Sequence, residues 1–506
     1  MPTDLVQVEL VGAAEDGVPQ VVTCTPGDAG TVVVGEGGDL PRQDSTVLAQ
    51  LGFTADAGAT KVVALPGADT DHFWLLGTGD ADERAWRTAG ARLVRAVDDR
   101  LARTGSAGHG AALQLWLPPT VDPQQVSALV TGLVLGSHQL RVTGSDHGPR
   151  LGSVALITTA TYELRDAVRL GSVLGRATAL ARDLAGMPSD VKSPQWLAET
   201  AERACTEVSG LQAIVRDERW LADNGFGGVL AVGGGSSRPP RLLELSWQPA
   251  GATTHVVLVG KGITFDTGGI SIKPAEGMHL MKTDMSGGAA VIAALRAVAE
   301  LELPIRVSGL VPCAENHVSG SAYRPGDVVT HYGGRTTEVS NTDAEGRMVL
   351  ADALAYAVDT LSPDAMVDVA TLTGAMKVAL GLRTGGLFAT TDELAQQIST
   401  AGARVGEQWW RMPLLADHAE AVVSDIADLR QGPPGPGGIT AALFLREFTA
   451  GLPWAHLDIA GPARAEQGYD EVAPVATGFA ARTLVELVRA MAPTASRPRL
   501  LQTSPR

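Results

Sequence analysis

The chain has 506 residues, which is enough for two or three domains and for a large buried core. Hydrophobic residues make up 45% of the chain and charged residues 19%, and this balance excludes an intrinsically disordered protein. The formal net charge of -16 argues against nucleic acid as a partner, because binding to the phosphate backbone requires a basic surface.

Cysteine usage and the first residues indicate the compartment. Cys24, Cys205 and Cys313 lie far apart and are odd in number, which favours a reducing environment over a disulfide framework. The chain begins without a basic segment followed by an apolar run, and no stretch is long enough to cross a bilayer. We therefore expect a cytoplasmic protein with no membrane contact.

The first third of the chain alternates short strand patterns with helical patterns. Apolar residues in 5–10 alternate with Gln7 and Glu9, the period of two that is typical of a strand with one buried face. Further segments of the same region favour strands at 31–34, 61–65, 73–76, 113–117 and 154–158, and helices at 82–98 and 124–136. This alternation predicts an N-terminal α/β domain over residues 1–161, without a candidate site of its own.

A long helix is expected next. Apolar and small residues recur every three or four positions over residues 162–184, and Gly186, Met187 and Pro188 then provide a stop signal. We interpret this helix as a connector between two domains. The alternative, that it belongs wholly to one domain, stays open.

Residues 185–506 predict a second, larger α/β domain. The expected strands lie at 228–232, 241–247, 255–259, 305–311 and 365–372, and the expected helices at 287–301, 348–360, 440–449 and 478–491. The strand patterns are continuous apolar runs rather than alternating ones. Such runs are typical of a central, mostly parallel sheet that is flanked by helices on both faces.

The segment 341–347 places two acids and an arginine between apolar flanks. Asp343 and Glu345 are two residues apart, so on an α-helix they would point to different faces, whereas a looped backbone could aim both into one pocket. We therefore expect a loop that enters a helix. Charged residues in such a place must be paired or must hold a cation, because unpaired burial is costly.

A glycine-rich segment at 260–274 follows the expected strand at 255–259. It does not fit the phosphate-binding pattern G-x-x-x-x-G-K-[ST], because Lys261 is followed by Gly262. The glycines are better explained by sharp turns of the backbone around a site. Asp266 lies within this segment, and Asp284 precedes the expected helix at 287–301, where Asp284 or Ser286 could also be a simple helix cap.

Four acids stand in glycine-flanked segments near the ends of apolar strands, where open α/β sheets gather ligands: Asp266, Asp284, Asp343 and Glu345. Four clustered carboxylates repel one another unless cations neutralise them. Such an oxygen-rich set can hold two divalent ions about 3.5–4 Å apart. The alternative is a closed salt network with the cations Lys261, Lys273 and Arg347.

Two of these segments carry a family resemblance. The sequence N-T-D-A-E-G-R at 341–347, with K-G-I-T-F-D-T-G-G-I-S-I-K at 261–273, resembles the leucyl (cytosol) aminopeptidase family of two-metal peptidases. Further matches are D-V-A-T-L-T-G-A at 368–375, W-R-M-P-L at 410–414 and H-L-D-I-A-G at 456–461. The resemblance covers residues 185–488, and the N-terminal third matches only in general character.

The resemblance implies a catalytic domain at 185–506 and a set of metal ligands in it. One metal ion would be held by Lys261, Asp266, Asp284 and Glu345, and the other by Asp266, Asp343 and Glu345. The implied cofactors are therefore two divalent ions per chain, Mn²⁺ or Zn²⁺. A lysine ligand must lose a proton from an ordinary pKa near ~10.4, which two adjacent cations favour.

The resemblance also implies roles in catalysis and binding. Lys273 would polarise the scissile carbonyl, and Arg347 would hold a bicarbonate ion that acts as a general base. The substrate would be bound by Lys273, Asp284, Thr371, Leu372 and Gly374. The expected reaction is removal of leucine and other N-terminal residues from peptides with a free N-terminus, by a hydroxide that bridges the two metals.

The family implies a homohexamer, which nothing in the composition tests. Two alternatives from other classes stay open at this point. One is a DNA-binding architectural role, which the acidic balance disfavours, and the other is a catalytically silent scaffold, which the complete ligand set disfavours.

Overall fold

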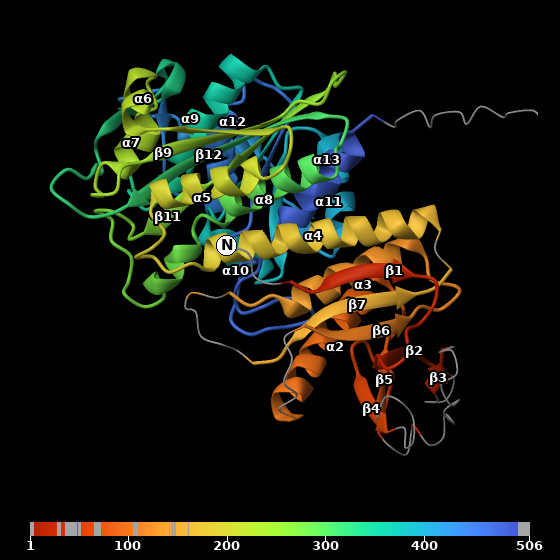
Figure 1. Cartoon of the computed structure of the whole chain (residues 1–506). Helices are drawn as coiled ribbons and strands as arrows, with labels where there is room; N and C mark the ends of the chain where they lie inside the picture. The colour runs from red at the N-terminus through yellow and green to blue at the C-terminus, as the bar shows by residue number, and fades with distance from the viewer. Residues whose placement is uncertain are drawn as a thin grey trace, which may run out of the picture.

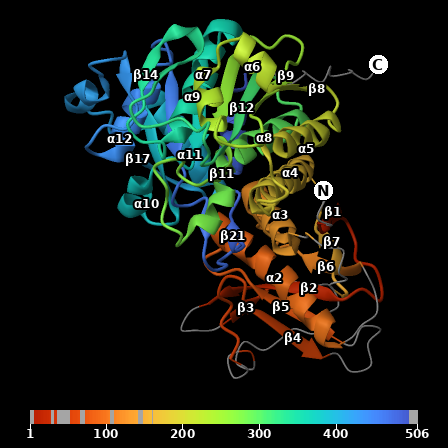
Figure 2. The same ribbon diagram turned by 90° about the vertical axis from the view of Figure 1, so that its left-hand side faces the viewer.

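The computed structural model describes residues 5–27, 32–35, 48, 52–64, 72–104, 110–140, 142, 148–159 and 161–493. Two α/β units pack against a long helix that runs between them (Figure 1). The smaller unit contains the N-terminal residues, and the larger unit contains the second half of the chain, as the view from the side also shows (Figure 2). The expected fold class, with a smaller N-terminal and a larger C-terminal α/β part, is confirmed.

The smaller unit is built on a sheet of strand order β1-β7-β6-β2-β5-β4, with β3 paired to β2. Its neighbours are parallel except for β4, which pairs antiparallel with β5, and β3, which pairs antiparallel with β2. The strands are β1 (Gln7–Val11), β2 (Gln20–Pro26), β3 (Val32–Val34), β4 (Thr60–Ala64), β5 (His72–Gly77), β6 (Ala111–Trp116) and β7 (Leu151–Ile157). Positions 31 and 65 of two expected strands lie outside the described residues, and β2 was not predicted.

Helices α2 (Glu83–Thr104) and α3 (Pro123–Ser137) share an apolar core with this sheet. The start of α3 follows from its sequence. The Asp122 carboxylate accepts hydrogen bonds from the backbone N–H groups of Gln124 and Gln125, the backbone N–H of Asp122 donates to Gln125 Oε1, and Pro123 occupies the first turn.

Helix α4 (Tyr162–Gly186) confirms the long helix that the sequence predicts. It packs against α3 on one side and against α8 (Ser286–Glu300) on the other. α4 therefore contacts both units. The predicted division into a domain at 1–161, a connector at 162–184 and a domain at 185–506 also requires that the two domains fold independently, and it stays a prediction.

The larger unit contains a nine-stranded sheet of order β17-β16-β19-β15-β10-β12-β9-β8, with β11 paired to the end of β12. The neighbours β19, β15, β10 and β12 are parallel, which confirms a mostly parallel centre. The strands are β8 (Leu211–Arg216), β9 (Arg241–Trp247), β10 (His255–Gly260), β11 (Gly262–Asp266), β12 (Arg306–Asn316), β15 (Ala365–Ala370), β16 (Thr384–Ala389), β17 (Gln408–Arg411) and β19 (Trp454–Asp458).

The central strand β10 explains why the strand patterns are apolar throughout. Val256 and Leu258 belong to one buried core, whereas Val257 and Val259 belong to another on the opposite face. Helices on the first face are α5 (Pro194–Thr206), α8, α11 (Asp392–Val405) and α13 (Ala481–Met491), and those on the second are α7 (Gly227–Gly233), α9 (Glu345–Tyr356) and α12 (Gly437–Arg446).

Shorter elements complete the larger unit. They are α6 (Glu218–Asp223), α10 (Gly374–Leu380), the 3-10 helices η2 (Met278–Thr283), η3 (Tyr332–Gly334) and η5 (Ala416–Val422), the π-helix η4 (Ala357–Leu361), and the strands β13 (Val328–Thr330), β14 (Thr336–Glu338), β18 (Leu429–Arg430), β20 (Arg464–Ala465) and β21 (Val475–Ala476). β13, β14 and β18 form one small sheet, and β20 pairs with β21.

One predicted element of this half is wrong. Residues 228–232 were expected to be a strand but lie in helix α7. Buried Val229 and Val232 are three positions apart, and the backbone N–H of Val229 donates to the buried Asp352 carboxylate over 2.9 Å. A five-residue apolar run is compatible with either structure, and this distant helix partner decides it. The other predicted strands and helices of this half are confirmed with shifted ends.

An ion-pair cluster joins α2 to the loop between β20 and β21. Arg87 Nε on α2 donates to Glu471 Oε1 over 2.9 Å, and both side chains are buried. Arg482 on α13 also binds Glu471, with Nη2 3.0 Å from the same oxygen. Nearby, Arg84 pairs with Asp470 over 3.0 Å at the surface. The two units are therefore connected by charged groups as well as by α4.

Candidate active site

The carboxyl ends of parallel strands gather side chains at one edge of the larger sheet. Lys261 follows β10, Asp266 ends β11, and Thr371 follows β15. This is the edge at which open α/β sheets bind ligands, as the positions of the acids predict. Asp343 and Glu345 reach the same edge from the loop before α9 and from its first residue. The expected loop that enters a helix is confirmed.

Hydrogen bonds join the loop before α9 to the loop that follows β11. Thr342 Oγ1 accepts a hydrogen bond from the N–H of Ser271 over 2.8 Å and donates to the Gly268 carbonyl over 2.7 Å. Gly268 and Gly269 have φ of 84° and 63°, and a Cβ on Gly268 would lie 3.0 Å from Asp343 Oδ1. The prediction that glycines turn the backbone around a site is confirmed at these two positions.

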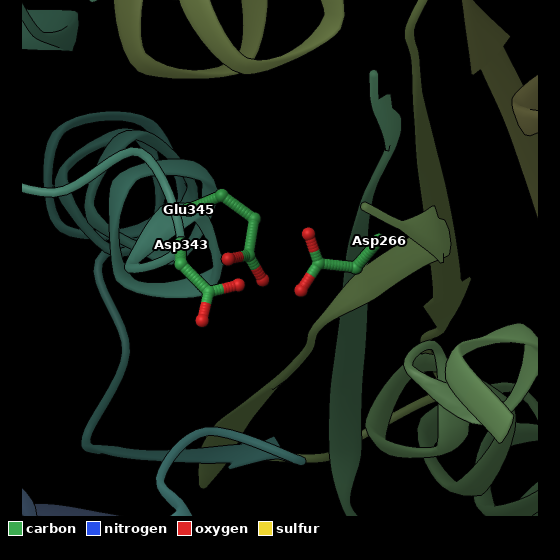
Figure 3. A group of neighbouring side chains, drawn as sticks. All are labelled: Asp266, Asp343 and Glu345. Carbon is green, nitrogen blue, oxygen red and sulfur yellow. The ribbon is translucent and has the colours of Figure 1, made fainter. Parts of the chain in front are cut away.

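Three carboxylates point toward a common centre from β11 and from the start of α9 (Figure 3). Asp266, Asp343 and Glu345 each offer one oxygen, and these atoms lie within 4.8 Å of one another. Asp266 and Glu345 are buried, whereas Asp343 is only partly buried. The geometry is suited to a cation that all three residues contact.

Two lysines occupy the spaces between the acids. Lys261 Nζ lies 2.8 Å from Asp284 Oδ2 and 2.7 Å from Glu345 Oε1, and it donates to the Thr371 carbonyl over 2.9 Å. Lys273 Nζ lies 2.7 Å from Asp266 Oδ2 and also binds Asp343. The two ammonium groups therefore connect all four acids that the sequence singles out.

The pKa values of the four acids and the two lysines of this cluster are all raised. Burial is the largest cause of the raised pKa of the four carboxyl groups, which belong to Asp266, Asp284, Asp343 and Glu345. Neighbouring carboxylates raise these pKa values further, and the lysines oppose the increase. Burial alone would lower the pKa of Lys261, but Asp284, Glu345 and Asp266 outweigh it and raise the pKa. Burial would also lower the pKa of Lys273, but Asp266 and Glu345 outweigh it and raise the pKa.

Asp284 does not cap the start of α8. It lies between η2 and α8, and no side chain caps the start of α8. Its Oδ1 accepts a hydrogen bond from Thr371 Oγ1 over 2.7 Å, while its Oδ2 pairs with Lys261. Asp284 therefore contacts Lys261 and Thr371, and its carboxylate is not used to cap α8.

Arg347 stands apart from the salt network. Its Nη1 donates to the Gln431 carbonyl over 2.6 Å, and its buried Nε has no hydrogen-bond partner in the described part of the chain. Burial lowers its pKa to about 10, against the effect of Glu345 and Asp458. A buried guanidinium without a carboxylate contact is suited to a small anion.

Comparison with known proteins adds an independent finding. Residues 179–485 match the model of the "Cytosol aminopeptidase family, catalytic domain". A "Probable cytosol aminopeptidase" of Corynebacterium glutamicum is 42% identical over 458 residues, which are 88% of this chain and 88% of that protein. One from Chlorobaculum tepidum is 39% identical over 485 residues, with 89% of this chain and 94% of that protein covered.

The chain belongs to the cytosol aminopeptidase family. A solved structure agrees: the bottromycin maturation enzyme BotP in complex with Mn has a TM-score of 0.80 and 40% sequence identity, and the match covers 94% of this chain and 100% of BotP. The protein is therefore a metal-dependent aminopeptidase, a hydrolase that acts on peptides. No helix in the described ranges combines the length and the apolar character that a membrane crossing requires.

The donor set of this aminopeptidase fits divalent metal ions. Four carboxylates face only two ammonium groups, so the buried cluster keeps an excess of two negative charges: Asp266, Asp284, Asp343 and Glu345 against Lys261 and Lys273. Oxygen donors are the ligands that hard cations such as Mn²⁺ prefer. A salt network alone leaves this charge uncompensated, which favours the metal-site interpretation over the closed network.

The expected substrate residues lie along the same edge of the sheet. Thr371 is buried, Leu372 is half-buried, and Gly374 is the exposed first residue of α10. The N–H of Leu372 donates to Asp458 Oδ1 over 3.3 Å, which orients the loop after β15. Lys273 lines a neighbouring cavity of about 350 Å³.

The sequence interpretation missed two supports of the aminopeptidase site. Asn316, the last residue of β12, donates from Nδ2 to Asp266 Oδ1 over 2.8 Å and to the Thr342 carbonyl over 3.0 Å. Gln431 donates to the Ala344 carbonyl over 2.9 Å. Asn316 could have been predicted from the sequence, because a polar amide at the end of an apolar strand lies where α/β sheets bind ligands. Gln431 lies 84 positions after Arg347, and only the fold brings it near.

Proposed function

We propose that the site holds two divalent metal ions and that the ligands are those the family resemblance implies. One ion would contact Lys261, Asp266, Asp284 and Glu345, and the other Asp266, Asp343 and Glu345. The observation that carries the proposal is the convergence of three carboxylates within 4.8 Å. BotP in complex with Mn supports Mn²⁺ as the ion, with Zn²⁺ as the alternative.

When bound, the ions activate a water molecule and polarise the scissile carbonyl of the peptide. The chain must then orient the substrate. Asp284 lies against Lys261 at the inner end of the site, where its carboxylate can accept the free α-amine of a peptide. Thr371, Leu372 and Gly374 would contact the main chain of the first residue. Recognition of a free amine explains the release of one N-terminal residue at a time.

Lys273 would act as a catalytic cation. Its side chain is 20% exposed, in contrast to 2% for Asp266, so it stands at the boundary between the carboxylates and solvent. The raised pKa keeps its ammonium group charged at neutral pH. A fixed positive charge at this position stabilises the negative charge that develops on the carbonyl oxygen as the amide is attacked.

Arg347 would bind bicarbonate, and this anion would accept and return the proton during hydrolysis. The unpartnered Nε and the lack of a carboxylate contact support this role. Arg347 lies on the first turn of α9, directly after Glu345 and Gly346, so an anion there would stand beside the metal ligands.

The decisive experiment assays purified protein on a panel of aminoacyl-anilides, with Mn²⁺ or Zn²⁺ supplied. We expect release of N-terminal leucine and other residues, and loss of turnover in Asp343→Asn and Glu345→Gln with an unchanged circular dichroism spectrum. Metal analysis should give two ions per wild-type chain. Full activity in both variants would refute the assignment. Asp428→Asn, at an exposed carboxylate bound to Thr336, is the matched control and should keep activity.

Three further features belong to the same proposal. The chain would assemble as a homohexamer, act in the cytoplasm, and fold as a domain at 1–161 and a catalytic domain at 185–506 joined by the helix at 162–184. They are supported by family membership and by the packing of α4 between the units. Light scattering of the purified protein tests the hexamer, and a monomer at micromolar concentration would exclude it.

A further inference from the structure

The cavity beside Lys273 contains a second cation that the proposed mechanism does not use. Its walls are largely apolar and include Met278, Met281 and Ala460. Arg464 lines the same cavity, whose volume is about 350 Å³. A substrate whose carbonyl lies at Lys273 would therefore extend along a wall that carries a guanidinium group.

Arg464 is fixed in place by its backbone. It belongs to β20, where it pairs with Ala476 of β21 in a two-stranded sheet, which Figure 2 shows between the two units near the label β21. The loop between β20 and β21 is anchored to the N-terminal unit through Glu471 and Arg87. The backbone of Arg464 is therefore positioned before any ligand arrives, so that only its side chain needs to be ordered on binding.

The guanidinium of Arg464 has no partner within the described ranges. It is half-buried, and no hydrogen bond or ion pair joins it to another described residue. Two fully buried arginines differ, since Arg87 pairs with Glu471 and Arg182 donates to the carbonyls of Thr477 and Glu471. Burial lowers the pKa of Arg464, and Asp284 opposes this effect. A partly desolvated cation without a partner is costly unless a ligand supplies the anion.

Other charges around the cavity do not neutralise Arg464. Glu276 and Glu466 line it but are exposed, and neither contacts Arg464 within ion-pair distance. Asp284 is already paired with Lys261. Lys377 adds a third positive charge at the wall, and it is exposed. The cavity thus combines largely apolar walls with a half-buried guanidinium that pairs with no acid in the described part of the chain.

We propose that Arg464 is a carboxylate-binding residue of the substrate cavity, so that the enzyme favours peptides that present a carboxylate there. Two sources share this chemistry: the side chain of an N-terminal glutamate, and the free α-carboxylate of a dipeptide. The inference rests on the proposed function, because it places the substrate at Lys273 and Asp284. Arg464 would set specificity and would not take part in the bond cleavage.

The test compares two matched pairs of substrates with the Mn²⁺-loaded enzyme. Glutamyl-anilide against glutaminyl-anilide reports a side-chain carboxylate, and Leu-Gly against Leu-Gly-amide reports an α-carboxylate. In the wild type we expect the carboxylate member of at least one pair to have the higher kcat/KM. Arg464→Met should reduce that ratio by about tenfold to a hundredfold, which corresponds to the loss of a charged hydrogen bond. The loss should fall mainly on KM, and Arg464→Lys should restore part of the preference.

The controls separate this inference from the proposed function. Arg103→Met removes an exposed charge in the last turn of α2 and should leave both ratios unchanged. If the wild type cleaves the uncharged substrates but Arg464→Met changes neither ratio, the inference is wrong and the aminopeptidase assignment stands. If the wild type cleaves none of the four substrates, both are wrong. Arg464→Gln supplies the same comparison should the methionine variant fail to fold.

Discussion

The side chain of Lys261 crosses the first turn of α9 directly against Gly346. A Cβ on Gly346 would lie 2.7 Å from Lys261 Cε and 2.8 Å from Lys261 Nζ. These distances are too short for unstrained contact, so the glycine leaves the space that the lysine needs to reach Glu345 and Asp284. The glycine of the N-T-D-A-E-G-R segment is therefore explained by the space that Lys261 occupies and not by a special backbone conformation.

Gly346→Ala should separate stability from activity. Alanine favours a helix over glycine by about 1 kcal/mol, and the obstructed atoms are the flexible end of a side chain, so we expect the fold to be kept. Lys261 must move, and kcat/KM should fall by more than about tenfold with weaker metal binding. Thermal unfolding and Mn²⁺-dependent hydrolysis measure the two effects. Gly320→Ala, where a Cβ meets nothing within 4 Å, is the control. Equal activity of both variants would contradict the prediction.

Metal binding should release protons and strengthen as the pH rises. Burial would lower the pKa of Lys261, but Asp284 and Glu345 outweigh it and raise the pKa, so the metal-free protein holds a proton on this amine that the proposed ligand must give up. Each proton released increases the affinity by about tenfold per pH unit. Calorimetric titration with Mn²⁺ between about pH 6 and pH 8, in buffers of different ionisation enthalpy, measures this. A heat that is independent of the buffer would contradict it.

Lys192 should stabilise the segment that carries Asp284. It is fully buried, and its Nζ donates to the carbonyls of Leu184 over 3.2 Å, Ala185 over 2.8 Å and Lys282. Burial and the charge of Lys282 lower its pKa to about 7, against the effect of Asp284. Lys192→Met removes these donors, and we expect a loss of about 1–3 kcal/mol in the free energy of unfolding at neutral pH.

The pH dependence of that loss has a defined sign. The folded pKa of Lys192 lies below the ordinary value, so the folded chain binds the proton less tightly than the unfolded chain. The contribution of this group to stability should therefore rise between about pH 7 and pH 10. Denaturant unfolding of the wild type and Lys192→Met at both ends of this window checks it. A difference between the two proteins that falls with pH would exclude the assigned shift.

The Arg87–Glu471 pair should be far more important than its neighbour at the surface. Arg87→Met leaves the buried Glu471 with one cation fewer, and we expect a loss of about 3–5 kcal/mol. Arg84→Met breaks the pair with Asp470, in which Arg84 is 65% exposed, and should cost no more than about 1 kcal/mol. Urea unfolding of the two variants makes the comparison. Similar losses would show that burial is not decisive here.

Acid should weaken the Arg87–Glu471 ion pair only at low pH. Burial would raise the pKa of Glu471, but Arg87 and Arg482 outweigh it and lower the pKa to about 2. A lowered folded pKa stabilises the protein above the ordinary glutamate value and loses this effect as the pH falls toward about 2. The stability difference between wild type and Arg87→Met should therefore persist at about pH 5 and shrink below it. A constant difference down to about pH 2 would contradict this.

The sequence by itself determined which charged residues form the cluster, because these residues lie in short local segments. Asp343 and Glu345 are two positions apart, and Asp266 follows Lys261 by five, so composition and glycine context already indicate a carboxylate cluster at strand ends. The parallel sheet was equally predictable from apolar runs such as 255–259. The prediction of a strand at 228–232 was wrong, because the local pattern suits a strand and a helix equally.

Only the tertiary structure decided which distant groups complete the site. Asn316 holds Asp266, and Gln431 holds Arg347 and the start of α9. These contacts join residues 50 to 87 positions apart in the chain, and no periodicity reports them. The sequence also does not distinguish Arg464 from the other arginines. Only the folded structure shows that Arg464 lines a cavity without an ion-pair partner in the described part of the chain. Local segments specify donor groups, whereas burial and charge balance depend on the whole fold.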